Sequence, residues 1–222
     1  MARYILRLLT DRLKPKGALI NKLPAANRII YIAEGIATLT TGTVTATLAA
    51  NSGWFHTGDI DVVAGAEGAL LLRYELLPLP QSDDGTVTSE GVHSHSTLGA
   101  VLDLDDAEGY LMRCDKVELP PGGIAYSHTH QGGGIRCLLE GAFNVTTDGN
   151  TKQFGPYEAW FEAGPEPVYA WAPDNKPGHF SRVMILPRRL HNQSSIRYVN
   201  TEDAVKPKLQ KYTIFIDEFI DT

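Results

Sequence analysis

The sequence predicts an all-β fold of two tandem jelly-roll barrels, also called double-stranded β-helices. Short segments rich in Val, Ile, Thr and aromatic residues recur about every ten residues, which is typical of β-sandwiches and barrels. The 21 glycines and 13 prolines provide turns between these segments. Helical periodicity is absent from the sequence, so the segments are interpreted as strands. An internal repeat then divides them into two barrels.

The repeat is visible when the sequence is shifted so that Trp54 falls on Trp160, an offset of 106 residues. Further aligned pairs are Tyr4 with Tyr110, Arg7 with Arg113, Pro15 with Pro121 and Val62 with Val168. A repeated unit of roughly 80 to 100 residues is longer than a solenoid repeat and has the size of a small domain. We therefore interpret the chain as a duplicated domain.

The expected strands follow the chain in order. They are Arg28 to Ile32, Ile36 to Thr40, Thr43 to Leu48, Ala69 to Leu76, Tyr110 to Glu118, Ile135 to Leu139, Ala142 to Thr147 and Phe180 to Leu186. The triplet Asp148-Gly149-Asn150 predicts a hairpin turn between two of them. Leu6 to Leu13 resembles a helix, but its repeat partner, Met112 to Pro120, has the pattern of a strand. We expect a strand in both places.

These patterns divide the chain into four parts. We predict an N-terminal barrel over residues 1–80, a linker over 81–106, a C-terminal barrel over 107–190 and a tail over 191–222. The linker is polar and rich in Gly, Ser and Asp, so His93 and His95 within it are expected to be solvated. Alternation in Tyr212 to Ile216 predicts that the tail adds an edge strand.

Composition limits the classes of partner. The net charge is −6, and no extended basic patch suggests binding to nucleic acid or to an anionic membrane. No apolar run reaches the roughly 18 residues of a membrane span, and the charged N-terminus does not resemble a signal peptide. A cytoplasmic protein is the resulting expectation. Cys114 and Cys137 are expected to be buried thiols.

One segment of the second half carries a pair of histidines among glycines. Gly122 precedes His128-Thr129-His130, and Gly134 and Gly141 follow with a seven-residue step. This segment resembles the first motif of the cupin superfamily. Gly155 and residues 162–167 are similar to a degraded second motif, and both motifs recur faintly in the first half. The chain thus resembles a bicupin with a degenerate N-terminal domain, because Lys22-Leu23-Pro24 replaces the histidine motif there.

The resemblance implies a metal site, but two of its usual ligands are missing. Metal-binding cupins commonly use two histidines and a glutamate from the first motif and a histidine from the second. Gly134 stands at the glutamate position and Pro167 at the second histidine position. His128 and His130 share one face of a strand and can bind one ion. The candidates for a missing ligand are Glu166, which we rank first, Glu162, Gln131 and His179.

The sequence does not identify the metal ion. Imidazole ligands suit several divalent transition metals, so Fe, Mn, Ni and Zn are all compatible with the histidine pair. Two protein ligands make a weak site unless another joins them. The alternative is an emptied site in which the two histidines only form hydrogen bonds within a polar pocket.

Further residues are expected near the histidines. If Gly134 faces inward, Arg136 does too, and a buried guanidinium needs an anionic ligand or a carboxylate such as Glu162 or Glu140. Tyr126 shares a face with the histidines by alternation, so Tyr126 and Arg136 are candidate catalytic residues. Gln131, Trp171 and Arg182 complete the candidate ligand-binding set, together with Arg136, although Arg182 has a counterpart in Arg73 that favours a structural role.

Two functions compete. The first is a metal-dependent cupin enzyme, an oxidoreductase, lyase or isomerase, that acts on a small, carboxylate-bearing molecule in the C-terminal barrel. The alternative is a non-catalytic bicupin that binds or stores a small molecule. The resemblance does not separate the reaction types, because one fold hosts many. A homodimer is a further expectation, since jelly rolls must protect their sheet edges.

Overall fold

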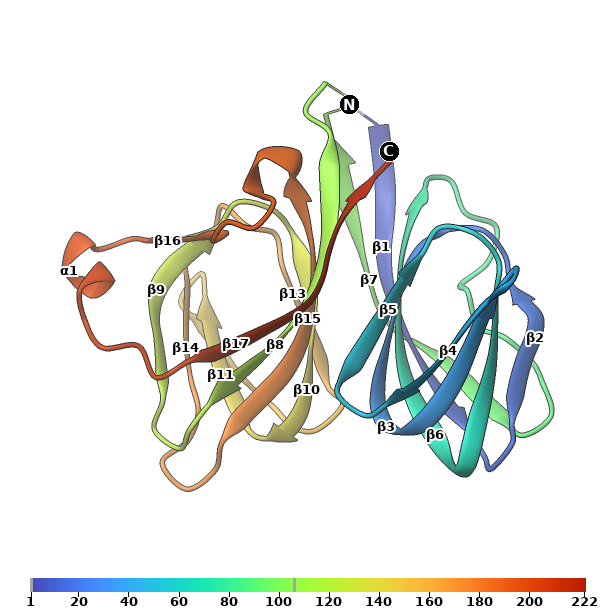
Figure 1. Cartoon of the computed structure of the whole chain (residues 1–222). Helices are drawn as coiled ribbons and strands as arrows, with labels where there is room; N and C mark the ends of the chain where they lie inside the picture. Colours follow the sequence, from blue (N-terminus) through green and yellow to red (C-terminus); the bar gives the residue numbers. More distant parts are fainter. Residues whose placement is uncertain (1, 106) are drawn as a thin grey trace. The chain divides into compact units, whose positions relative to one another are not determined.

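The computed structural model describes residues 2–105 and 107–222. Met1, the first residue of the predicted N-terminal barrel, and Asp106, the last residue of the predicted linker, lie outside the described residues. The chain forms two compact units, one comprising Met1–Ala107 with Asp221–Thr222 and the other Glu108–Ile220. Both are built almost entirely of strands (Figure 1). Within the described ranges, no helix has the length and apolar character required to span a bilayer.

The first unit is a single, strongly bent antiparallel sheet. Its main path is β4-β3-β6-β1-β7, with β2 added to β6 and β5 added to β3. Long strands contribute to both walls of this barrel. For example, β3 pairs with β5 near one end and with β4 near the other. The strands are β1 (Ala2–Leu13), β2 (Ala18–Leu23), β3 (Asn27–Thr41), β4 (Val44–Ala49), β5 (Ser52–His56), β6 (Ile60–Pro78) and β7 (Val92–Leu104).

The second unit is a sandwich of two five-stranded sheets, with orders β13-β10-β15-β8-β17 and β12-β11-β14-β9-β16. The strands of the first sheet are β8 (Tyr110–Leu119), β10 (Gly134–Gly141), β13 (Ala159–Glu162), β15 (Gly178–Pro187) and β17 (Lys211–Ile220). Those of the second are β9 (Ile124–His130), β11 (Phe143–Thr147), β12 (Asn150–Phe154), β14 (Val168–Trp171) and β16 (Ile196–Tyr198). Two short helices lie in the tail, η1 (Arg188–Leu190) and α1 (Thr201–Ala204).

Strand pairing follows the internal repeat. Ile30 lies opposite Arg73 and Trp54 in the first unit, and its counterpart Arg136 lies opposite Arg182 and Trp160 in the second. The proposed equivalence of Arg73 and Arg182 therefore holds in the sheet register. Leu6 to Leu13 is part of β1, as its repeat partner in β8 predicted.

The predicted linker is wrong in part, because residues 92–104 within it form β7. This strand pairs along the whole length of β1 and buries Leu102 and Leu104. His93 and His95 are exposed on this edge strand, whereas Ser94 donates a hydrogen bond to the buried Asp11. In the tail, β17 pairs with β8 at the edge of its sheet, which is the role predicted for residues 212–216.

Buried side chains fill the two interiors differently. In the second unit, Phe143, Phe154, Trp160 and Phe180 form an aromatic cluster with ring centroids 4.7–5.8 Å apart. The first unit has a buried aliphatic cluster, which includes Leu19, Ile30 and Val62, and beside it a network of buried charges. In that network Glu75 accepts hydrogen bonds from Arg7, Arg28 and Arg73, and Arg73 also donates to Asp11.

Candidate metal centre

Three potential metal ligands meet inside the second unit. His128 and His130 lie on β9, and their Nε2 atoms are 3.2 Å apart. Glu162 ends β13 on the opposite sheet and places Oε2 3.1 Å from the Nε2 atom of His130. The ligand atoms of the three residues all lie within 4.8 Å of one another. The structure thus brings together the histidine pair and one of the predicted carboxylates.

The carboxylate belongs to Glu162 on β13, whereas the cupin motif has its glutamate at position 134 on the neighbouring strand β10. Gly134, at the motif's glutamate position, lies directly opposite Glu162 in the register of β10 and β13. A Cβ atom on Gly134 would lie 2.5 Å from the carbonyl oxygen of Val183 and 2.7 Å from Cγ of Met184. Backbone crowding therefore excludes a side chain at position 134, and Glu162 supplies the carboxylate from across the strand pair.

Both imidazoles are neutral, and that of His128 is held in a tautomer that can bind a cation. Burial lowers the pKa of His128, and burial lowers the pKa of His130 to about 3 despite the neighbouring Glu162 carboxylate. Both rings are therefore neutral at pH 7. The Nδ1 atom of His128 donates a hydrogen bond of 2.7 Å to the backbone carbonyl of Tyr126. That bond leaves the lone pair on Nε2, which faces His130 and Glu162.

Glu162 is ionised and firmly held. Burial alone would raise its pKa, but the Arg136 charge and hydrogen bonds from His130 and Trp160 hold the pKa well below its usual range. Nη2 of Arg136 lies 2.8 Å from Oε2, and Nε1 of Trp160 donates to Oε1 at 2.8 Å. Arg136 also donates to the carbonyl of Gly134 at 2.5 Å. The predicted inward position of Arg136 is correct, and its partner is the carboxylate of Glu162.

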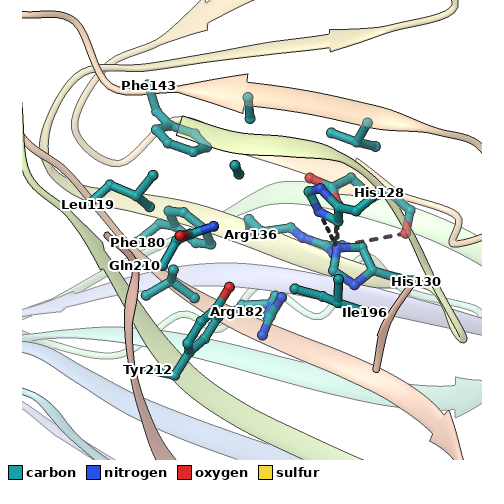
Figure 2. Close-up of a pocket in the computed structure, with 15 residues that line it drawn as sticks. Leu119, His128, His130, Arg136, Phe143, Phe180, Arg182, Ile196, Gln210 and Tyr212 are labelled. Atoms are coloured by element: carbon teal, nitrogen blue, oxygen red, sulfur yellow. Dashed lines mark hydrogen bonds and ion pairs between the residues drawn. The ribbon is translucent and has the colours of Figure 1, made fainter. Parts of the chain in front are cut away.

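The three residues line a small chamber of about 30 Å³. The imidazoles lie at one end of it, and Phe143 and Phe180 lie toward the other (Figure 2). Arg182 also lines the chamber, where its guanidinium makes two hydrogen bonds, of 2.9 and 2.6 Å, with Asp115. Each buried arginine of the chamber is therefore balanced by one carboxylate.

Tyr126 does not share the inner face of β9 with the histidines. The pairing of β9 with β14 shifts register, so that His128 lies opposite Val168 but Ala125, not Tyr126, lies opposite Ala170. This bulge breaks the strict alternation on which the prediction depended. Ala125 lines the chamber, whereas the Tyr126 ring lies beneath the ammonium groups of Lys206 and Lys208.

Glu166, ranked first from the sequence, is exposed and lies outside the group of three. β13 ends at Glu162, and residues 163–167 form a loop to β14 that faces solvent except at Gly164. The carbonyl of Gly164 accepts a 2.7 Å hydrogen bond from the backbone of His130. The loop therefore supports β9 through its backbone and does not bring the Glu166 side chain inward.

The remaining candidates lie away from the chamber. Gln131 accepts a hydrogen bond from Arg197 at 2.6 Å, and His179 pairs with Glu140 at the surface. Trp171 is on the opposite face of β14 from the chamber-lining Ala170 and contacts the ring of Tyr169. None of these three side chains lines the chamber.

Besides the apolar side chains of β8, β9, β11, β14 and β15 that line the chamber, four residues in or next to it were not predicted from the sequence. These are Asp115, Ile196, Gln210 and Tyr212. The last three belong to the tail. Because the tail has no counterpart in the other repeat, no aligned strand indicates which of its side chains face inward. Asp115 had one available signal, because a buried arginine at position 182 requires a carboxylate on a neighbouring strand.

Comparison with known proteins identifies the fold. No protein-family model matches the sequence, and no curated protein matches it significantly. Solved structures do match. An oxalate decarboxylase from Lactobacillus farciminis, in complex with formate, aligns over 90% of this chain and 82% of its own, with TM-score 0.63 and 13% identity. AerE from Microcystis aeruginosa aligns over 82% and 88%, with TM-score 0.56 and 13% identity.

A third similar structure is Ylba from Escherichia coli, which aligns over 83% of this chain and 78% of its own, with TM-score 0.55 and 15% identity. The chain has the cupin fold. Its two tandem jelly-roll barrels confirm the predicted fold class. At 12–15% identity the likeness concerns the fold, and the chemistry must be argued from the residues of this chain.

Proposed function

We propose that the second barrel is a divalent transition-metal centre held by His128, His130 and Glu162, and that the protein is a metal-dependent cupin enzyme acting on a small, carboxylate-bearing molecule. The observation that carries this proposal is the position of Glu162, whose Oε2 atom lies 3.1 Å from Nε2 of His130. A third ligand thereby joins a histidine pair that would bind weakly alone.

Two of the three separations between ligand atoms, and the charge state of the three residues, fit a metal ion, and the group as a whole lies within 4.8 Å. Ligand atoms bound about 2.1 Å from one ion are roughly 3.0 to 3.4 Å apart, close to the 3.2 and 3.1 Å separations present here. The imidazoles are neutral and the carboxylate is ionised, as coordination requires. When bound, such an ion polarises a substrate oxygen or lowers the pKa of a bound water. Fe, Mn, Ni and Zn are all compatible with this donor set.

The charge balance of the chamber favours an anionic ligand. Arg136 offsets Glu162, and Arg182 offsets Asp115, so these four side chains are neutral overall. A divalent cation would therefore add net positive charge to a buried site, and an anion would relieve it. Similar solved structures include oxalate decarboxylases, one in complex with formate. A small carboxylic acid is the substrate class that these observations support.

Neighbouring residues orient the side chains that would bind the metal. Arg136 and Trp160 hold opposite oxygens of Glu162, which fixes the carboxylate for coordination. The carbonyl of Tyr126 fixes the tautomer of His128. Arg136 is thus a positioning residue whose charge also faces the chamber, and Arg182 adds a second, balanced charge beside it. The first barrel, with its buried ion pairs, is proposed to be a structural partner.

A second candidate is a non-catalytic binding protein without a metal. The observation that favours it is the set of bonds that Glu162 already makes to Arg136, Trp160 and His130. In that case the histidines and the carboxylate form one polar cluster in a closed interior. The two candidates differ in one measurable property, the affinity of the protein for a transition metal.

The test is metal analysis of protein purified without an affinity tag, followed by calorimetric titration with Mn, Fe, Ni and Zn. We expect close to one equivalent of metal per chain. His128→Ala should abolish binding, whereas Lys22→Ala, at the same repeat position of the first unit, should leave binding intact. Less than about a tenth of an equivalent, with no binding of added metal, would favour the non-catalytic candidate.

A further inference from the structure

The tail connects the two sheets of the second unit across one open side. Its strand β16 pairs with β9, placing Ile196 opposite His130 and Tyr198 opposite His128. Its strand β17 pairs with β8 of the other sheet, beginning with Lys211 opposite Glu118. Figure 1 shows the chain leaving β16, turning through α1 and returning along β17. The residues between these strands therefore cross from one sheet to the other beside the histidine pair.

Two cavities meet where β16 and β17 approach each other. The inner chamber holds His128, His130 and Glu162, and an outer cavity of about 310 Å³ lies between the loop before β16 and the strands β8 and β17. Arg182, Ile196 and Tyr212 line both cavities. Two of these three residues belong to the tail. The tail thus forms the partition between the outer cavity and the candidate metal centre.

The inner chamber is too small for a substrate while this partition is in place. A volume of about 30 Å³ accommodates about two water molecules, since each needs roughly 10 to 15 Å³ measured in this way. A carboxylic acid of several heavy atoms requires the tail side chains to move. The outer cavity, about ten times larger, has room for such a molecule.

Gln210 brings an unused acceptor to the chamber. Its Oε1 atom is buried, and no donor among the described residues binds it. A buried amide oxygen without a partner is costly, so its position favours a ligand that carries a hydrogen-bond donor. Gln210 lies immediately before β17 and, like Tyr212, lines the inner chamber (Figure 2).

The crossing segment is attached mainly at the surface. The ammonium groups of Lys206 and Lys208 lie 4.9 and 5.3 Å from the centroid of the Tyr126 ring. Lys206 also pairs with Asp203 within the segment, and residues 204–207 and 209 are exposed. Surface cation–π contacts of this kind contribute only about 0.5–1 kcal/mol each. The segment can therefore move with less cost than the strands on either side.

We propose that Ile196, Gln210 and Tyr212 form a gate that determines which molecules reach His128, His130 and Glu162. With the gate closed, water and ligands of very few atoms enter. A larger carboxylic acid waits in the outer cavity and enters when the side chains of Ile196 and Tyr212, which line both cavities, move aside, and the Gln210 amide then accepts a hydrogen bond from it. The substrate class of this gate rests on the proposed function, whereas the restricted access to the histidines does not.

Histidine labelling tests the gate without a metal. Diethyl pyrocarbonate, which is larger than the chamber, modifies neutral imidazoles, and peptide mass spectrometry gives a rate for each histidine in the folded protein. We expect His128 and His130 to react at least ten times more slowly than the exposed His93 and His95. Gln210→Ala and Tyr212→Ala should each raise the rates at His128 and His130 several-fold. Leu209→Ala, at an exposed neighbour, should leave them unchanged.

Two results would overturn the gate. One is equal labelling of the chamber histidines and of His93 and His95 in the unchanged protein. The other is unaltered rates in both Gln210→Ala and Tyr212→Ala, each verified as folded by circular dichroism. Titration of the same variants with Co(II) separates the two proposals, because failure to bind cobalt counts against the metal centre while the labelling rates still decide the gate.

Discussion

Gly134 and Glu162 lie directly opposite each other on neighbouring strands, and together they place one carboxylate beside the histidine pair. The glycine removes a side chain where the backbone of β15 comes close, and the glutamate approaches from the edge strand β13. A site that looked incomplete along the sequence therefore gains a third potential ligand from a neighbouring strand. Four predictions follow from this arrangement and from its counterpart in the first unit.

Gly134→Ala should destabilise the protein. The added Cβ atom would lie 2.5 Å from the Val183 carbonyl oxygen and 2.7 Å from Met184 Cγ, and overpacking of this kind costs about 1–3 kcal/mol. Urea unfolding followed by circular dichroism measures the loss. Gly155→Ala is the control, because its Cβ atom would meet only Glu158 Oε2, at 3.6 Å. Equal stability of the two variants would contradict the crowding argument.

Glu162→Gln should remove metal binding and also lower stability. The substitution leaves the Arg136 guanidinium buried without a carboxylate, and breaking a buried ion pair costs about 3–5 kcal/mol. Calorimetric titration with Mn or Zn and thermal unfolding measure the two effects. Glu166→Gln, at the exposed loop position, should change neither. Loss of metal binding in Glu166→Gln would restore the ligand that was ranked first from the sequence.

Trp160→Phe should lower the stability of the protein more than Trp54→Phe, although the two residues occupy equivalent repeat positions. Nε1 of Trp160 donates to Glu162, so its loss should cost about 1–2 kcal/mol and weaken metal binding. Nε1 of Trp54 is buried with no acceptor in the described part of the chain. Trp54→Phe should thus be close to neutral. Chemical unfolding of both variants checks this, and similar losses would contradict it.

The first unit should lose stability in acid through Glu75. Burial alone would raise its pKa, but Arg73 and Arg28 lower it to about 2. The folded state therefore favours the ionised form, and its contribution, on the order of 3 kcal/mol, is complete above pH 4.5 and declines as pH falls toward 2. Relative to Glu75→Gln, the wild-type advantage in urea unfolding should shrink below pH 4.5. A constant difference between pH 7 and pH 3.5 would contradict it.

Several strands were predictable because one repeat supports the other, although Arg28 to Ile32 and Ile36 to Thr40, expected as two strands, belong to the single strand β3. Leu6 to Leu13 was assigned correctly only through its partner in β8, and the inward direction of Arg136 followed from strict alternation along β10. Alternation failed at Tyr126, where a bulge in β9 inserts one extra residue. A bulge changes side-chain direction without a sequence signal that alternation can detect.

The remaining errors concern contacts between segments far apart in sequence. Glu162 and Glu166 were both candidates, and the choice depended on where β13 ends and the loop begins. The polar composition of residues 92–104 concealed an edge strand, because such a strand buries few side chains. The tail has no repeat partner, so the approach of Gln210 and Tyr212 to the histidines was outside what periodicity could predict.

The origin of the three ligands has a mechanical consequence. His128 and His130 belong to the sheet β12-β11-β14-β9-β16, and Glu162 belongs to the sheet β13-β10-β15-β8-β17. An ion bound by all three would brace the two layers of the sandwich against separation, as a covalent cross-link does. It would also anchor the four-residue strand β13, which contacts only β10 as a strand neighbour. Occupancy of the proposed centre would thereby also stiffen this short edge of the barrel.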